Sequence, residues 1–143
     1  MKKIIITVIT GLVFVSAGYA QNSHLETRFN QIAKRDGFAY VYMGKGYSEL
    51  KVSEELTKEF KSITFVKILS SEKTRDKGVK NDIRLLKIML ELEKFELILK
   101  ITYDTNDKTE IYLKKSGKNE LEKVIIMEDP EEVSVTWIYG EGK

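Results

Sequence analysis

The sequence predicts an α+β protein in which about three helices pack on one face of a mainly antiparallel sheet. Three observations predict this fold class. Apolar residues recur at helical spacing in three segments of residues 23–90. Two runs rich in aromatic and β-branched residues lie between these segments and are typical of strands. From Leu97 onward apolar residues alternate with polar ones, so the sheet is expected to end in a four-stranded antiparallel meander.

The first segment, "KKIIITVITGLVFVSAGYAQNS", has the order of a secretory signal peptide, with two lysines, an apolar run and then small residues. The apolar run of roughly a dozen residues is shorter than the about 20 that a membrane-spanning helix needs. Gly18 and Ala20 place small side chains before a cut between Ala20 and Gln21. The alternative is a β-branched core strand. We expect residues 1–20 to be cleaved, which leaves residues 21–143 as one domain that is periplasmic or secreted and has no stable membrane anchor.

Composition excludes several classes of protein. The chain has no cysteine, which excludes disulfides and thiolate metal sites. Loss of Lys2 and Lys3 from the 24 basic residues leaves 22, equal to the 22 acidic residues, so the mature chain is formally neutral. A neutral domain lacks the electrostatic attraction behind non-specific nucleic-acid binding. We therefore expect no nucleic-acid partner.

The first two helices and strands are expected before residue 70. A Ser-x-x-Glu capping box at Ser23 begins the first helix, and Gly37 is a left-handed stop after it. The apolar stripe of this helix is Leu25, Phe29, Ile32 and Ala33. A strand over residues 38–43 follows, and Gly44-Lys45-Gly46 ends it. Val52, Leu56 and Phe60 predict a second, short helix, and residues 63–69 predict the second strand.

The second half of the chain begins with a polar run, "SEKTRDKGVKND" at residues 71–82, which is expected to be a surface loop. Ile83, Leu86 and Leu90 then give the third helix a broad apolar face, and this helix should be the most buried. Strands are expected over residues 97–103, 110–114, 121–127 and 133–139. The sequences DTND, SGKN and EDPEE supply the turns between them.

The order of these elements resembles the domain of unknown function 4252 family, which occurs in exported proteins of Gram-negative bacteria. The features that carry the resemblance are the signal peptide, "YVYMGKG", "ILSSE", "TEIYLKKSGKNELEKVIIMED" and "WIYG". They cover nearly the whole mature chain, but they consist of strand and turn residues. The resemblance implies an exported protein and no established activity.

No catalytic, cofactor-binding or metal-ligating residue is predicted. The single histidine, His24, is expected to be exposed in the first turn of a helix. Gly44-Lys45-Gly46 lacks the spacing of a phosphate-binding loop. Carboxylates cluster at Glu54, Glu55 and Glu59 and again at Asp129, Glu131 and Glu132, where solvated faces are the simplest interpretation. Basic residues cluster at Lys114, Lys115, Lys118 and Lys123 and at Lys73, Arg75, Lys77 and Lys80, either of which could touch an anionic surface.

These observations favour a non-enzymatic exported module that binds an envelope or secreted protein, and they leave the oligomeric state open. One alternative is a hydrolase of envelope or extracellular polymers that uses Glu54, Glu59 or Asp129. The other is a carrier of a lipid or small ligand. Strand alternation assigns Leu97, Leu99, Ile101, Ile111, Leu113, Val133, Val135 and Trp137 to the helix-facing side of the sheet. The candidate partner face on the opposite side is then Ile98, Thr102, Tyr112, Thr136 and Ile138.

Overall fold

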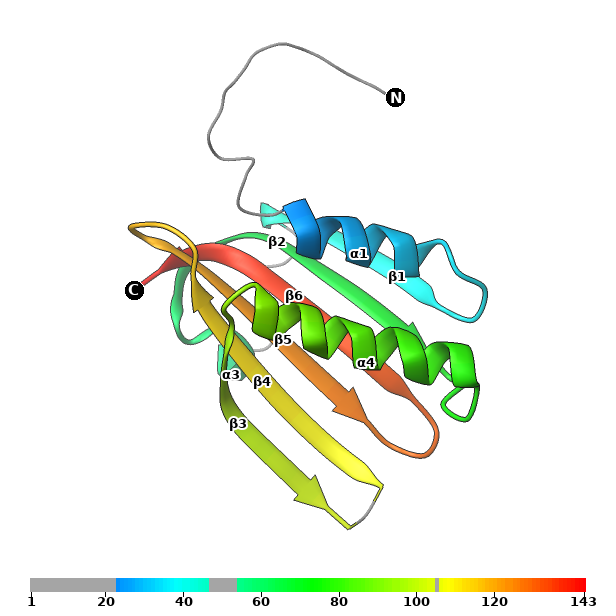
Figure 1. Cartoon of the computed structure of the whole chain (residues 1–143). Helices are drawn as coiled ribbons and strands as arrows, with labels where there is room; N and C mark the ends of the chain where they lie inside the picture. Colours follow the sequence, from blue (N-terminus) through cyan, green and yellow to red (C-terminus); the bar gives the residue numbers. More distant parts are fainter. Residues whose placement is uncertain (1–22, 47–53, 105) are drawn as a thin grey trace.

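The computed structural model describes residues 23–46, 54–104 and 106–143, which form helices and one antiparallel sheet (Figure 1). This confirms the α+β class. The elements are α1 (Ser23–Ala33), β1 (Ala39–Gly44), α3 (Glu54–Thr57), β2 (Phe60–Ser71), α4 (Lys77–Leu92), β3 (Glu96–Tyr103), β4 (Asp107–Lys115), β5 (Glu120–Glu128) and β6 (Val133–Gly142). The expected signal peptide, its cleavage site at Ala20 and Gln21, and Val52 lie outside the described residues.

The six strands form one sheet in the order β1-β2-β6-β5-β4-β3, and every neighbouring pair is antiparallel. β1 and β3 are the edge strands. β6 and β5 are the central strands, and β6 approaches β2 closely at Gly140, beside an irregularity in β2. A Cβ atom on Gly140 would lie only 2.2 Å from the carbonyl oxygen of Ser62, so only glycine fits there.

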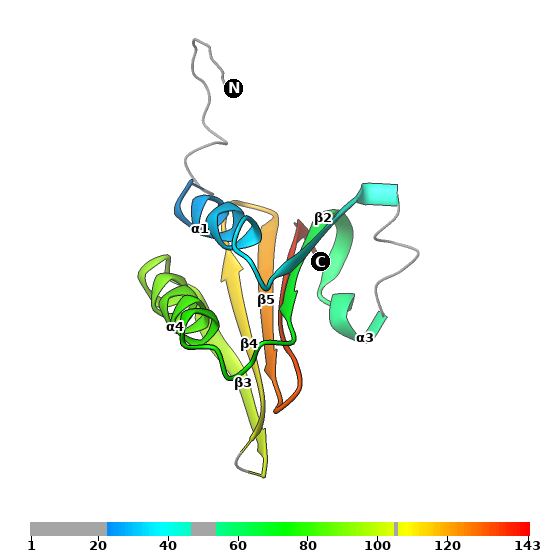
Figure 2. The same cartoon turned by 90° about the vertical axis from the view of Figure 1, so that its right-hand side faces the viewer.

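Helices α1 and α4 lie on one side of the sheet and α3 lies on the other (Figure 2). The prediction that all the helices share one face is therefore wrong for α3. The reason is a buried lysine on β5. Lys123 Nζ donates hydrogen bonds to the Leu56 carbonyl oxygen at 3.0 Å and to Glu59 Oε1 at 2.8 Å, which fixes α3 to the side opposite α1 and α4.

The main core lies between the two longer helices and the sheet. The apolar stripe of α1 is buried as expected, with Leu25, Phe29 and Ile32 each 2 % exposed or less. The Phe29 ring packs 5.3 Å from the Trp137 ring. This core consists of Leu25, Phe29, Ile32, Leu69, Val79, Ile83, Leu86, Leu90, Phe95, Tyr112, Val124, Ile126, Val133, Val135 and Trp137.

Helix α4 begins earlier than its apolar pattern predicts. The expected surface loop over residues 71–82 is wrong for its second half, where the chain is already helical from Lys77. The side chain of Asp76 accepts hydrogen bonds from the backbone N–H groups of Gly78 and Val79, at 2.8 and 3.1 Å. This N-cap starts the helix one turn before the broad apolar face. Val79 is buried in that turn, while the charged residues beside it face solvent.

A second, smaller cluster lies on the α3 side of the sheet. It consists of Met43, Phe60, Ile63, Val66, Leu121, Ile125 and Ile138, with Leu56, Ile68, Ile111 and Leu113 packed against it. Both faces of the sheet are therefore apolar. Because a solvated face would show polar residues at alternate positions, this pattern departs from that of an antiparallel sheet with one wet side.

The predicted strand faces are right for β6 and wrong for β4. Val133, Val135 and Trp137 face the helices as expected. Ile111 and Leu113, assigned to the same side, pack in the opposite cluster, and Tyr112 is buried beneath the helices at 5 % exposure. On β4 the three apolar residues 111–113 are consecutive, so both faces of the strand carry apolar side chains. Alternation alone therefore cannot tell which of the two faces meets the helices.

Candidate functional site

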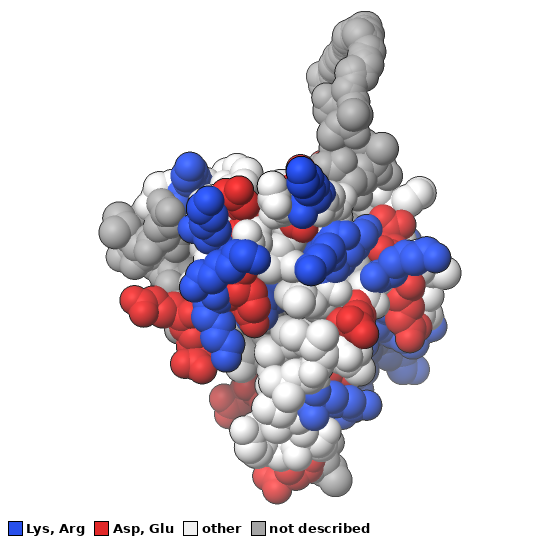
Figure 3. All heavy atoms as spheres, turned by 90° about the vertical axis from the view of Figure 1, so that its left-hand side faces the viewer, with Lys and Arg blue, Asp and Glu red and all other residues white. Residues whose placement is uncertain are grey.

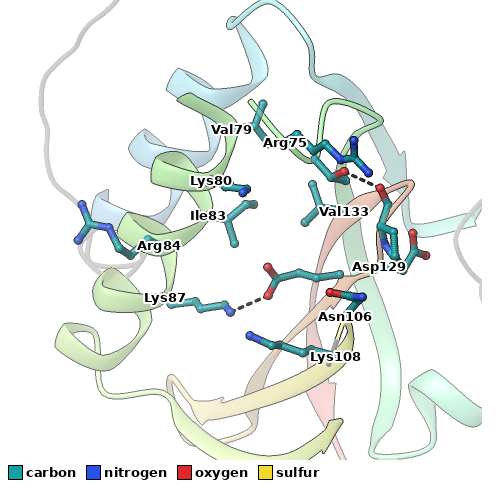
Figure 4. Close-up of a pocket in the computed structure, with 13 residues that line it drawn as sticks. Arg75, Val79, Lys80, Ile83, Arg84, Lys87, Asn106, Lys108, Asp129 and Val133 are labelled. Atoms are coloured by element: carbon teal, nitrogen blue, oxygen red, sulfur yellow. Dashed lines mark hydrogen bonds and ion pairs between the residues drawn. The ribbon is translucent and has the colours of Figure 1, made fainter. Parts of the chain in front are cut away.

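The structure contains a cleft of about 530 Å³ beside the first half of α4 (Figure 4). Its walls come from α4 and the loop before it, from the β3–β4 turn with the start of β4, and from the β5–β6 turn. The lining residues are Thr74, Arg75, Val79, Lys80, Ile83, Arg84, Lys87, Asn106, Lys108, Glu128, Asp129, Pro130 and Val133. The hydroxyl of Thr74 donates to the Pro130 carbonyl oxygen at 2.7 Å and so joins two of these walls.

Lys87 connects α4 to the sheet at one end of the cleft. Its Nζ lies 2.8 Å from Glu110 Oε1 and 2.7 Å from Glu128 Oε2. Burial lowers the pKa of Lys87, but the hydrogen bonds to the two carboxylates and their negative charges together outweigh burial, so the pKa is raised overall. Lys87 therefore stays charged near neutral pH and holds the helix at a fixed distance from β4 and β5.

Three other cations line the cleft without such partners. Arg75, Lys80 and Lys108 form no ion pair or side-chain hydrogen bond with any residue in the described part of the chain. We call them the cleft cations. Lys80 and Lys108 extend toward the cavity from opposite walls, and Arg75 lies near the β5–β6 turn, whereas Arg84 points away from the cavity (Figure 4).

The two acidic residues of the cleft are already engaged. Glu128 pairs with Lys87. Asp129 Oδ1 accepts the backbone N–H groups of Glu131 and Glu132, each at 2.7 Å, and so shapes the β5–β6 turn. Five basic side chains line the cleft against these two carboxylates, so the cleft carries an excess of positive charge. Sequence reasoning noted the basic run that contains Arg75 and Lys80, but it missed Lys108, which only the fold brings to the same cavity.

The carboxylates considered for a hydrolase do not converge. Glu59 is engaged by Lys123 near α3, and Glu54 is exposed on α3. Asp129 lies at the β5–β6 turn. Burial raises the pKa of Glu59, but its hydrogen bonds from Lys123 and the backbone, together with the charges of Lys123 and Lys58, outweigh burial, so the pKa is lowered overall. His24 is exposed in the first turn of α1.

The five residues of the candidate partner face do not share one side of the sheet. Thr136 and Ile138 lie on the side opposite α1 and α4, where Ile138 is fully buried. Tyr112 is in the helix-side core, and Thr102, which pairs with Lys108 on β4, lies on that side too. Ile98 sits at a register shift between Leu97 and Leu99, and it is 45 % exposed. The register shift changes which residues of β3 face each side of the sheet, and no pattern in the sequence predicts it.

The side opposite the two longer helices carries a different surface. The strand pairings align one residue from each strand in a row across the sheet: Val41, Ile68, Thr136, Ile125, Ile111 and Leu99. The next row is Ala39, Ser70, Ser134, Met127, Thr109 and Ile101. We call these two rows the uncharged face. Val41, Leu99 and Met127 are 47, 43 and 52 % exposed, so this face is open at both edges of the sheet.

From Lys108 to Lys114, strand β4 carries its charged side chains on the helix-facing side of the sheet and only uncharged ones on the opposite side, which is the reverse of the usual arrangement in a sheet with one solvated face. Its charged residues Lys108, Glu110 and Lys114 pair across the sheet with residues on the helix-facing side. Thr109 and Ile111 lie on the uncharged face. Seen from the left-hand side of Figure 1, an uncharged area runs down the molecule between charged groups (Figure 3).

Comparison of the chain with family models, with curated proteins and with solved structures found no match in any of the three. No helix within residues 23–46, 54–104 and 106–143 combines the length and apolar character needed to cross a membrane. The same residues contain no cluster of three or more His, Asp or Glu side chains that could hold a metal ion.

Proposed function

We propose that the protein is an exported, non-catalytic interaction module that binds a partner protein through the uncharged face. A signal peptide at residues 1–20, cleaved between Ala20 and Gln21, and kinship with the domain of unknown function 4252 family belong to the same proposal. The observation that supports it best is the pair of rows without a charged side chain on the side of the sheet opposite α1 and α4.

The chemistry of this face defines the partner. Exposed apolar side chains grouped on one face are typical of a protein–protein contact, and Val41, Leu99 and Met127 are exposed on this face around a centre at Ile125 that is packed in the second cluster. Because neither row has a charged side chain, a charged partner surface would be desolvated without compensation. The partner is therefore an envelope or secreted protein that presents an uncharged, apolar surface. The hydroxyl groups of Ser70, Ser134, Thr109 and Thr136 can supply hydrogen bonds within the contact.

Site-specific photo-crosslinking in cells that export the protein tests this proposal. A benzoylphenylalanine placed at Leu99 or Met127 is expected to give an adduct with one partner of defined mass. The matched control is the same group at Leu97, which lies on the same strand with nearly equal exposure, 45 against 43 %, but on the helix-facing side. Leu97 is expected to give no such adduct.

A second variant separates binding from folding. Thr109→Lys places one charge in the uncharged face at a half-buried position, and it is expected to abolish the adduct from Leu99 while circular dichroism stays unchanged. Equal adducts from Leu97 and Leu99, or no adduct at all, would refute the proposal. An adduct with the mass of two copies of this chain would show instead that the face joins identical subunits.

A further inference from the structure

We propose that the cleft beside α4 binds a soluble organic phosphate, with the phosphate on the cleft cations and the apolar portion of the ligand against Val79, Ile83 and Val133. The site lies on the helix side of the sheet, away from the uncharged face. It goes beyond the proposed interaction with a partner protein, and either can fail without the other.

The first argument is charge. Buried lysines elsewhere in the described structure have a carboxylate: Lys67 Nζ lies 2.9 Å from Glu26, and Lys123 Nζ lies 2.8 Å from Glu59. In the cleft Lys87 already uses both of its acidic neighbours. The three cleft cations are exposed, face one cavity and form no ion pair with any described residue, and five basic side chains line this cavity against the two carboxylates of Glu128 and Asp129. Like charges around a shared cavity repel one another, so an anion bound between them is favoured.

The second argument is the geometry of the donors. A phosphate ester carries two charges near neutral pH and three terminal oxygens, which three separate cations can share. The planar guanidinium of Arg75 matches two of those oxygens at once. Lys80 and Lys108 reach from the two opposite walls, one on α4 and one on β4, so the anion would sit between helix and sheet (Figure 4).

The third argument is the remainder of the cavity. Inorganic phosphate alone would leave most of about 530 Å³ unfilled, and this volume is in the range of small-molecule sites. Val79, Ile83 and Val133 form apolar wall on α4 and β6. A phosphate attached to a small apolar group therefore fits the cleft better than phosphate or a sulfate-like ion.

Calorimetric titration of residues 21–143 tests the proposal with phenyl phosphate, inorganic phosphate and benzyl alcohol as probes. Phenyl phosphate is expected to bind saturably and about tenfold or more tightly than inorganic phosphate, and benzyl alcohol is expected not to bind. The double variant Lys80→Gln with Lys108→Gln should weaken phenyl phosphate binding by about tenfold or more, because each lost contact is a charge-assisted hydrogen bond.

The matched control removes the same two charges elsewhere. Lys77 lies on the first turn of α4 and Lys100 on β3, and neither lines the cleft. The double variant Lys77→Gln with Lys100→Gln is expected to bind phenyl phosphate within twofold of the unsubstituted protein. Equal weakening by both double variants would show only a general effect of net charge and would overturn the proposal.

Three further outcomes would also overturn it. The first is no saturable binding of phenyl phosphate at millimolar concentration. The second is binding of benzyl alcohol as tight as that of phenyl phosphate, which would make the anion irrelevant. The third is binding to phosphatidylcholine vesicles that contain phosphatidic acid but not to phenyl phosphate, which would assign the cations to a lipid surface.

Discussion

Replacement of Tyr112 by alanine is expected to destabilise the protein far more than replacement of Leu99. The two residues lie on neighbouring strands, but they face opposite sides of the sheet. Tyr112 is 5 % exposed within the helix-side core, whereas Leu99 is 43 % exposed on the uncharged face. The comparison therefore measures which side of β4 the helices cover.

The expected magnitudes follow from burial. Truncation of a fully buried aromatic side chain to alanine costs about 3–5 kcal/mol, because it loses transfer free energy and leaves a cavity. Full burial of a leucine side chain contributes about 1.5–3 kcal/mol, and Leu99 buries little more than half of its surface, so its loss should cost about 1 kcal/mol. For a domain of this size the melting temperature should fall by about 10 °C or more for Tyr112→Ala and about 4 °C for Leu99→Ala.

Urea unfolding followed by circular dichroism and by fluorescence measures both free energies. The single tryptophan, Trp137, is fully buried in the same core as Tyr112 and so reports its unfolding. Tyr112→Phe is the control, because it keeps the ring and should change stability by less than about 1 kcal/mol. If Leu99→Ala proves more destabilising than Tyr112→Ala, the assignment of the two faces is refuted.

Three other predictions concern the fold. Gly140→Ala should prevent folding or lower the free energy of unfolding by more than about 3 kcal/mol, since its Cβ would lie 2.2 Å from the Ser62 carbonyl oxygen. Its control, Gly46→Ala, should leave the melting temperature unchanged, because no atom lies within 4 Å of a Cβ at that position. Lys123→Met should lower the free energy of unfolding by about 3 kcal/mol, because Glu59 and the Leu56 carbonyl oxygen lose their hydrogen-bond donor. The same variant should be cleaved faster by trypsin after Lys58. An unchanged cleavage rate would contradict the role of Lys123 in holding α3. Burial raises the pKa of Glu122 above its ordinary 4.5 more than the hydrogen bond from Trp137 Nε1 lowers it. The contribution of the protonated acid to stability is therefore complete below pH 4.5 and is lost as the pH rises through the raised value. Glu122→Gln should therefore gain stability relative to the unsubstituted protein between pH 4 and pH 7, and a difference that is independent of pH would be inconsistent with that shift.

The elements with one clear period were predictable from the sequence. The stripe of α1 and the left-handed stop at Gly37, whose φ is 93°, follow from local chemistry alone. Strands β5 and β6 were placed within a few residues of their ends. The start of α4 was missed because the cap at Asp76 stands in a polar run that resembles a loop. Local signals therefore locate elements well, but they locate helix ends poorly when the first turn is charged.

The faces of the sheet were harder to predict, because they depend on contacts between distant segments. Glu110 is charged, yet it lies on the helix-facing side since Lys87 on α4 reaches it. Ile111 is apolar, yet it lies on the other side. A rule that sends apolar residues toward the helices fails on β4 for this reason, and the register shift beside Leu99 hides the alternation on β3.

Lys67, Lys123 and Lys80 show why the cleft could not be recognised before the fold was known. Lys67 lies amid apolar residues of β2, and its ammonium pairs with Glu26 over the rings of Phe65 and Trp137. Lys123 is equally buried and holds α3. Both lysines form ion pairs that stabilise the fold, because a buried ammonium without a partner would be destabilising. Lys80 instead lines the cleft and forms no ion pair with any described residue. Lys108, near the start of β4, lines the same cleft from the opposite wall. Because Lys80 and Lys108 are both exposed to solvent, folding does not require a partner for either charge, and both remain available to an anion bound in the cleft.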